Sequence, residues 1–276
     1  MNQAYPQSNR YKALFTCLAE QKQAAFIPFV IIGDPNPELS LAIIKTMIDA
    51  GADALELGIP FSDPSADGIT IQKAANRALA ANVTTDSCLS ILAEIRAYAP
   101  NIPIGLLLYG NLVFARGIEN FYRDVANAGV DSVLIADLPI RESAPFRAAA
   151  NLYGINAIFI APPNASDATL QHIAEYSQGY TYVLSRAGVT GANDTQHHSA
   201  QVMLEKLKSY HAAPTIQGFG ISAPEQVKAA IESGAHGAIS GSATVNIIEQ
   251  HLDNPPQLQI ELAKFIKKMK AATIIS

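Results

Sequence analysis

Short apolar runs alternate with longer amphipathic stretches along this chain, a pattern typical of repeated strand and helix units with a parallel sheet. Eight runs have the length of buried strands, at residues 25–32, 54–58, 103–108, 132–136, 156–160, 180–184, 215–218 and 238–240. Between them, apolar residues recur at spacings of three and four in the stretches 37–50, 85–97, 118–128, 142–152, 167–176, 199–210 and 224–233, which are predicted helices. The chain is therefore predicted to be an α/β protein.

The number of these units predicts the architecture. Gly51, Gly129 and Gly234 stand where a helix passes directly into the next strand, as expected for left-handed helix C-caps. Eight units in about 250 residues favour a closed (β/α)8 TIM barrel over an open sheet, which usually has fewer parallel strands. Further helices are predicted at 10–21, covering the barrel bottom, at 70–79 and at 256–272. No Gly-, Ser- or Pro-rich linker divides the chain, so residues 1–276 are expected to form a single domain with extra N-terminal and C-terminal helices.

Composition and charge exclude several classes of function. The 276 residues are 49% hydrophobic, and 19 Lys and Arg against 24 Asp and Glu give a net charge of -5, so no nucleic-acid partner is expected. The longest apolar run, 24–32, contains Pro28 and falls well short of the roughly 20 residues that span a bilayer. Residues 1–10 lack the apolar core of a signal peptide, and Cys17 and Cys88 have no CxxC spacing. A cytoplasmic protein without a membrane partner is therefore expected.

Glycine-rich windows follow the last three predicted strands. They lie at residues 188–191, 218–220 and 241–242. In TIM barrels the active site lies at the carboxyl ends of the strands, and the last loops commonly bind phosphate. Backbone amides exposed by glycine at the start of a helix suit a phosphate dianion. The alternative is that these are three tight turns in which glycine serves only the backbone geometry.

The most informative stretch is the acidic window at 55–68. Glu56 stands inside a strand between two leucines, where a carboxylate is costly unless it points into the barrel mouth or belongs to a structural ion pair. Asp67 precedes Gly68 and a predicted helix, so it is either a site residue or a helix N-cap. Asp63 stands before a proline, as turn-initiating aspartates often do.

Several mechanisms lack the residues that they need. No lysine stands at a predicted strand end, which leaves a Schiff-base aldolase without a nucleophile. The histidines form no HxH or HExxH motif, so no metal site is expected. Both cysteines fall in predicted helices, away from the strand ends. The mechanism that remains is general acid and base catalysis by carboxylates on a phosphorylated substrate.

In these sequence windows and along essentially its whole length, the chain resembles the tryptophan synthase alpha subunit family. The run 55–67 is the family's most specific signature. That run lies within a longer matching window, 51–68, and the other matching windows are 28–29, 33–35, 109–111, 162–164, 180–186, 188–191, 217–221 and 239–242.

The resemblance implies a carbon–carbon lyase of tryptophan biosynthesis, which cleaves indole-3-glycerol phosphate to indole and glyceraldehyde 3-phosphate by a retro-aldol step. By correspondence, Glu56 moves protons at the indole C3 and at the hydroxyl of the substrate's side chain, and Asp67 accepts a hydrogen bond from the indole N–H. Tyr182 supplies a further hydroxyl near the reacting side chain. The side chains that would line the indole slot, or else are ordinary barrel core, are Phe29, Leu107, Leu134, Ile160 and Phe219.

The resemblance also places the phosphate and a partner. The phosphate would lie on Gly191, Gly220, Gly241 and Ser242, and the loop 186–196 would be a mobile lid whose Thr190 reaches Asp67 when closed. Similar proteins form tetramers with a beta subunit that carries pyridoxal phosphate, so this chain itself is expected to hold no cofactor.

Two positions differ from the family signature, which has leucine in place of Ser65 and proline in place of Ile69. Both flank the loop thought to face the beta subunit, so coupling to the partner is in question more than the chemistry. Two alternatives to the lyase follow: a binding and activating subunit with little activity of its own, and an unrelated phosphate-binding barrel enzyme such as an isomerase.

Overall fold

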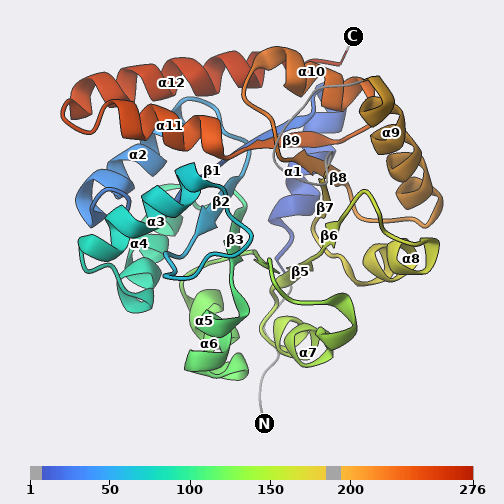
Figure 1. Ribbon diagram of the computed structural model, residues 1–276, viewed down its shortest axis with the longest axis horizontal. Coiled ribbons are helices and arrows are strands. Elements are labelled where there is room, and N and C mark those ends of the chain that lie inside the picture. Colours follow the sequence, from blue (N-terminus) through green and yellow to red (C-terminus); the bar gives the residue numbers. More distant parts are fainter. Residues whose placement is uncertain (1–7, 185–193, 276) are drawn as a thin grey trace.

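The computed structural model describes residues 8–184 and 194–275, the side chains of 194–200 excepted. In this part of the chain, parallel strands form one sheet in the order β5-β4-β3-β2-β1-β9-β8-β7-β6 (Figure 1). The strands are β1 (Ala25–Ile31), β2 (Leu55–Gly58), β3 (Ile104–Leu108), β4 (Ser132–Ile135), β5 (Asn156–Ile158), β6 (Ile160–Ala161), β7 (Thr181–Leu184), β8 (Thr215–Gly218) and β9 (Gly237–Ser240). Each predicted strand is present with its ends within one residue of the prediction.

The two edges of this sheet are halves of one strand. β5 pairs with β4, β6 pairs with β7, and only Phe159 separates β5 from β6 along the chain. The sheet therefore closes on itself as an eight-stranded barrel, which confirms the predicted (β/α)8 fold.

Helices surround the barrel (Figure 1). They are α1 (Arg10–Glu20), α2 (Pro37–Asp49), α3 (Ile69–Ala80), α4 (Thr85–Tyr98), α5 (Gly110–Arg116), α6 (Ile118–Asn127), the 3-10 helix η1 (Ile140–Glu142), α7 (Ala144–Leu152), α8 (Asp167–Tyr176), α9 (Asp194–Ser209), α10 (Pro224–Glu232), α11 (Ser242–Gln250) and α12 (Pro255–Ala271). No described helix is both long and apolar enough to cross a bilayer.

Two helical predictions need correction, and two helices were missed. The stretch 142–152 is divided at Ser143, because Pro145 belongs in the first turn of a new helix and cannot continue the preceding one. The predicted helix 199–210 begins at Asp194, five residues early. Helices α5 and α11 were not predicted, since each begins within two residues of a strand end, inside a window read as a loop.

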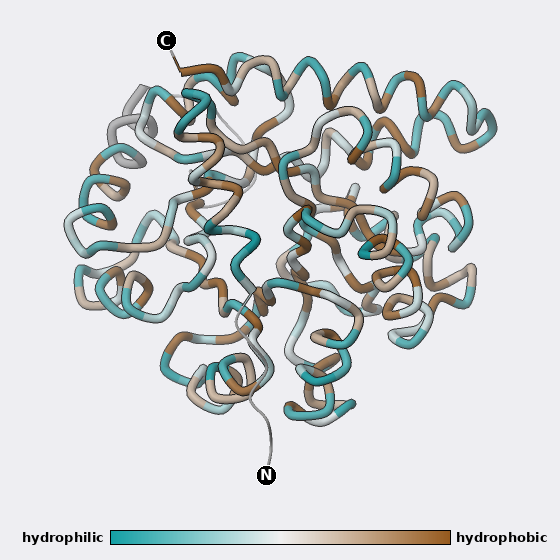
Figure 2. Tube along the Cα trace, turned by 180° about the vertical axis from the view of Figure 1, so that it is seen from behind, coloured by the Kyte–Doolittle hydropathy of each residue, from teal (hydrophilic) through white to brown (hydrophobic). Residues whose placement is uncertain are grey.

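Local sequence explains where the described helices begin, and burial explains where they pack. Asn36 caps α2 by accepting a hydrogen bond from the Leu39 amide, and Thr84 and Ser87 form a capping box on α4. Every residue of β1, β2, β8 and β9 is buried, because helices cover one face of the sheet and side chains fill the barrel on the other. Hydrophilic positions recur along the surrounding helices (Figure 2). The polar strand residues Glu56 and Ser132 thus lie in a largely apolar interior.

Candidate active site

A cavity of about 710 Å³ lies at the carboxyl ends of the strands, within the size range of small-molecule sites. Its wall brings together residues from both halves of the barrel. Among the predicted site residues, those in the wall are Phe29, Glu56, Asp67, Leu107, Ile160, Tyr182, Phe219, Gly220, Gly241 and Ser242. Thr190 and Gly191 lie outside the described residues. The remaining residue, Leu134, is buried between its register partners Leu107 and Ile158, which both line the cavity.

Glu56 reaches the cavity from β2 and is only 2% exposed. Burial raises the pKa of its carboxyl to about 7, although a hydrogen bond from the Tyr180 hydroxyl to Oε1, at 2.9 Å, opposes that rise. Within the described part of the chain no cation forms an ion pair with Glu56, so a structural ion pair does not account for this carboxylate there. A carboxyl with a pKa near neutrality can both give and take a proton.

Asp67 does not cap the helix that follows it. Gly68 is the N-cap residue of α3, and no side chain bonds to that helix end. Instead, Asp67 Oδ2 accepts a hydrogen bond of 2.9 Å from the Tyr109 hydroxyl, which itself accepts one from the Ala66 amide at 3.1 Å. Burial raises the pKa of Asp67, and the bond from Tyr109 lowers it. The helix-cap alternative is therefore wrong, and the carboxylate is held at the cavity wall.

Tyr182 lies within electrostatic range of both carboxylates. Its side chain is 6% exposed and lines the cavity from β7. Burial raises the pKa of its hydroxyl, and the charges of Glu56 and Asp67 raise it further. The hydroxyl therefore stays protonated and can donate a hydrogen bond to a ligand between the two acids.

Another part of the cavity wall offers amides to an anion. Helix α11 begins at Ser242 with Gly241 as N-cap and without a side-chain cap, so its first N–H groups have no partner within the helix. Gly241 and Ser242 line the cavity, where these amides and the positive end of the helix dipole suit a phosphate. Gly220 has a φ of +79°, a conformation that favours glycine, so backbone geometry also contributes there, as the tight-turn alternative expects.

Sequence reasoning assigned no role to Tyr109 or Tyr180. A signal for each was present: Tyr109 directly follows a predicted strand, and Tyr180 shares a strand face with Tyr182 because side chains alternate. The apolar wall was also mostly missed; it includes Ile71, Ile135, Leu138, Pro139, Ile140, Ile158, Phe159, Pro162, Ile173, Leu184, Ile221 and Ile239. Among the described residues, no group of three or more His, Cys, Asp or Glu side chains could hold a metal ion.

Comparisons with known proteins show which family this chain is similar to. The family described as tryptophan synthase alpha chain matches residues 15–274. The tryptophan synthase alpha chain of Vibrio cholerae El Tor Inaba N16961 is 62% identical, with 97% of this chain and 100% of the relative covered. That of Escherichia coli O81 is 60% identical, with 96% and 98% covered.

Solved structures show the same fold. The tryptophan synthase alpha subunit of Legionella pneumophila Paris superposes with a TM-score of 0.86 at 29% identity, over 96% of this chain and 98% of the other. A chain of the tryptophan synthase complex of Pyrococcus furiosus gives a TM-score of 0.79 at 31% identity, over 90% and 98%. An unrelated isomerase barrel is thereby excluded, and the chain belongs to the tryptophan synthase alpha chain family.

Proposed function

We propose that Glu56 and Asp67 carry out in this chain the reaction of its family, the lyase cleavage of indole-3-glycerol phosphate to indole and glyceraldehyde 3-phosphate. The observation that supports these roles is the placement of two carboxyls on one cavity, one of them with a pKa raised to about 7. The Tyr182 hydroxyl lies within electrostatic range of both carboxyls. The pair provides an acid, a base and a negative charge without a further catalytic group.

The proposed step balances with these groups alone. Protonated Glu56 gives a proton to the indole C3, which creates a positive charge on the ring nitrogen. Asp67 stabilises that charge and accepts a hydrogen bond from the ring N–H. The side-chain hydroxyl then loses its proton to Glu56, its C–O bond becomes a carbonyl, and the electrons of the breaking C–C bond return to the indole ring. Glu56 ends protonated, ready for another cycle.

The rest of the cavity suits the two ends of this substrate. Phe29, Leu107, Ile160 and Phe219 offer an apolar slot for the indole ring, and Leu134 is the buried register partner of Leu107. The amides at the start of α11, with Gly220, would hold the phosphate. The lid at 186–196, with Thr190 and Gly191, stays a prediction, because most of that loop lies outside the described residues.

We further propose that the chain works without a cofactor, since the proton transfers above need only its carboxyls. As a tryptophan synthase alpha chain it has a beta subunit as its partner, and pyridoxal phosphate is expected there. A cytoplasmic location agrees with two free cysteines, Cys17 and Cys88.

The test is indole release from indole-3-glycerol phosphate by the full-length chain, alone and with a beta subunit. Glu56→Gln and Asp67→Asn should each lose most turnover, whereas Asp63→Asn, an exposed carboxylate of the same loop, should not. Wild-type turnover near the uncatalysed rate without the partner would instead favour the low-activity binding subunit. Full activity of either first variant would refute the residue assignment.

A further inference from the structure

A row of residues runs from Glu56, in the cavity wall, across two neighbouring strands. Glu56, Gly105 and Ser132 are register neighbours on β2, β3 and β4, so they face the same side of the sheet. A Cβ on Gly105 would stand 2.7 Å from Ser132 Oγ and 3.0 Å from the Tyr11 hydroxyl. The missing side chain in the middle of the row therefore makes room for Tyr11, which comes from helix α1 at the other end of the barrel.

Tyr11 connects this row to the hydrogen bond on Glu56. Its hydroxyl shares a hydrogen bond of 2.9 Å with Ser132 Oγ, and its ring packs against the ring of Tyr180, with centroids 5.4 Å apart. Tyr180 in turn donates its hydroxyl hydrogen to Glu56. All four side chains are at most 2% exposed, so no water competes for these bonds.

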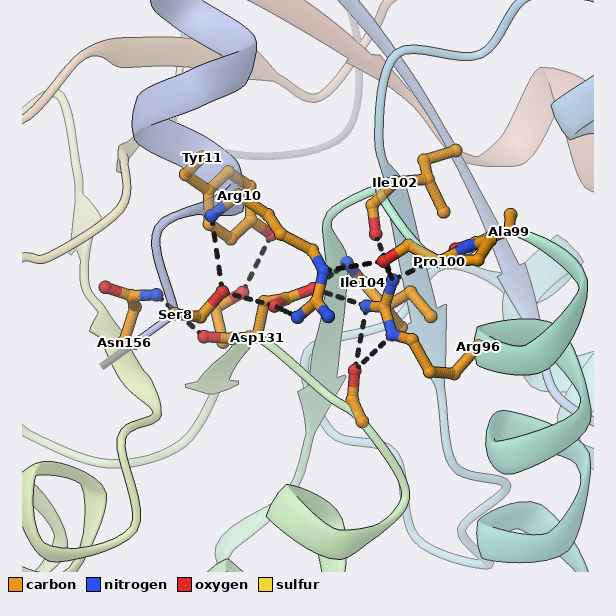
Figure 3. Close-up of polar contacts among 12 residues, drawn as sticks. Ser8, Arg10, Tyr11, Arg96, Ala99, Pro100, Ile102, Ile104, Asp131 and Asn156 are labelled. Atoms are coloured by element: carbon orange, nitrogen blue, oxygen red, sulfur yellow. Dashed lines mark hydrogen bonds and ion pairs between the residues drawn. The ribbon is translucent and has the colours of Figure 1, made fainter. Parts of the chain in front are cut away.

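Tyr11 is fixed in place by its neighbour along the chain (Figure 3). Arg10 Nη1 donates to Asp131 Oδ1 at 2.8 Å, and Asp131 directly precedes Ser132. Consecutive residues of α1 thus bind consecutive residues at the start of β4. Arg10 forms an ion pair with Asp131, and Tyr11 forms a hydrogen bond with Ser132. The second oxygen of Asp131 accepts from Arg96 Nη2 at 2.6 Å and from the Ile104 amide at 2.8 Å, which anchors the carboxylate itself.

We propose that Tyr11 and Ser132 are positioning residues for the reaction: the N-terminal helix holds Tyr180 against Glu56 and thereby sets the protonation equilibrium of that acid. This inference rests on the proposed function for Glu56 as the proton shuttle. A tyrosine needed only for packing would be replaceable by phenylalanine, so the hydroxyl of Tyr11 is the part under test.

The electrostatic surroundings of Glu56 give the sign of the effect. Among the described residues, the titratable groups that the charge of Glu56 acts on are Tyr11, Tyr180 and Tyr182. Burial raises the pKa of each hydroxyl most, and the charge of Glu56 raises it further. Asp131 and Arg96 act on Tyr11 in opposite directions. For Glu56 itself, burial raises the pKa and the bond from Tyr180 lowers it. Any change that loosens Tyr180 should therefore raise the pKa of Glu56 above its value of about 7.

The experiment compares Tyr11→Phe, Tyr180→Phe and the double variant in the full-length chain. The carboxyl of Glu56 is titrated by 13C NMR, with its resonance assigned as the one missing from Glu56→Gln, and kcat and KM for indole release are measured. We expect the midpoint to rise by roughly one pH unit in Tyr180→Phe and by about half a unit in Tyr11→Phe. The double variant should show no shift beyond Tyr180→Phe, because both act through one bond. In Tyr11→Phe, kcat should fall roughly three- to tenfold with KM unchanged.

Leu18→Ala is the matched control, since Leu18 is also a buried residue of α1 but has no polar atom in the row. It should lower the melting temperature without moving the midpoint. A wild-type midpoint in Tyr11→Phe, or an equal shift in Leu18→Ala, would overturn the proposal. If Tyr11→Phe does not fold, Ser132→Ala removes the same hydrogen bond and carries the same expectation. Full turnover of Glu56→Gln would refute the proposed function instead, while the titration would still report on the positioning.

Discussion

Gly218 leaves the space that the ring of Tyr182 occupies. A Cβ on Gly218 would stand 2.6 Å from Tyr182 Cε1 and still closer to the end of that ring, so glycine at this position is a condition for the placement of Tyr182 in the cavity wall that it shares with Glu56 and Asp67. Neighbouring strands carry the two residues, with Leu184 of β7 as the register partner of Gly218. Gly218, in one of the glycine-rich windows, therefore serves the site by making room for the side chain of Tyr182.

Gly218→Ala should therefore displace Tyr182 and lower activity. We expect a loss of about 1 to 3 kcal/mol in the free energy of unfolding from overpacking, together with a fall in kcat. Adding Tyr182→Phe to Gly218→Ala should not relieve the clash, because ring carbons are also too close. Adding Tyr182→Ala removes the clash but leaves a cavity, so this double variant should lose less stability than the two single losses add up to, without recovering activity. Melting temperature and turnover of Gly218→Ala, Tyr182→Ala and the two double variants check this. Wild-type stability and turnover in Gly218→Ala would show that the ring has room to move.

Glu56→Gln should abolish cleavage and stabilise the fold in a pH-dependent way. General acid and base contributions are typically 10²- to 10⁴-fold, and this residue would serve in both roles. Because the folded pKa of about 7 lies above the ordinary value of 4.5, ionisation opposes folding: the penalty is absent below about pH 4.5, grows as the pH rises to 7, and is full above it. The amide removes a penalty of up to about 3 kcal/mol.

Denaturant unfolding at pH 4.5 and pH 8 checks that prediction. The variant should gain stability over the wild type at pH 8 and little at pH 4.5. An equal difference at both values would mean that the carboxyl of Glu56 does not carry the raised pKa.

Asp67→Asn should lower turnover severely while substrate still binds. The amide oxygen can accept a hydrogen bond from the indole N–H, but the neutral amide cannot neutralise the charge that develops on the ring nitrogen. Since Asp67 caps no helix, the loss of about 1 kcal/mol that removal of an N-cap causes is not expected. A melting curve and steady-state kinetics on one preparation separate the two effects. A destabilised but active variant would contradict the assignment.

The architecture was predictable from the sequence, whereas the contacts of Asp67 and Tyr11 were not. Buried strands of a parallel sheet are apolar along their whole length, so their runs stand out and their ends were found to within one residue. The N-cap preference of Asp67 is local information, and a hydroxyl from Tyr109, 42 residues along the chain, wins against it. Likewise the bonds of Tyr11 and Glu56 span more than 120 residues, and only closure of the barrel brings those partners together.

Ser242→Asp should separate phosphate binding from helix stability. A carboxylate in the first turn of α11 interacts favourably with the helix dipole, which typically contributes 0.3 to 1 kcal/mol of stability, but it repels an anion at the same amides. We therefore expect an unchanged or higher melting temperature together with a raised KM. In a crystal soaked in phosphate, the ion should lie against Gly220, Gly241 and Ser242 in the wild type only. An unchanged KM would place the phosphate elsewhere.

Ser65→Leu with Ile69→Pro should strengthen the association with a beta subunit from a relative that carries the family signature. Ser65 is exposed and Ile69 is 73% exposed, so both are accessible to a partner. A buried leucine at an interface is typically worth about 1 to 3 kcal/mol. Proline at 69, the first residue of α3, fits a helix start and reduces the freedom of the unbound loop beside Asp67. Titration of that beta subunit with both forms should show tighter binding by the double variant, while turnover of the isolated chain changes little. Equal affinity, or a large change in the isolated turnover, would mean that these positions act on the chemistry and not on the interface.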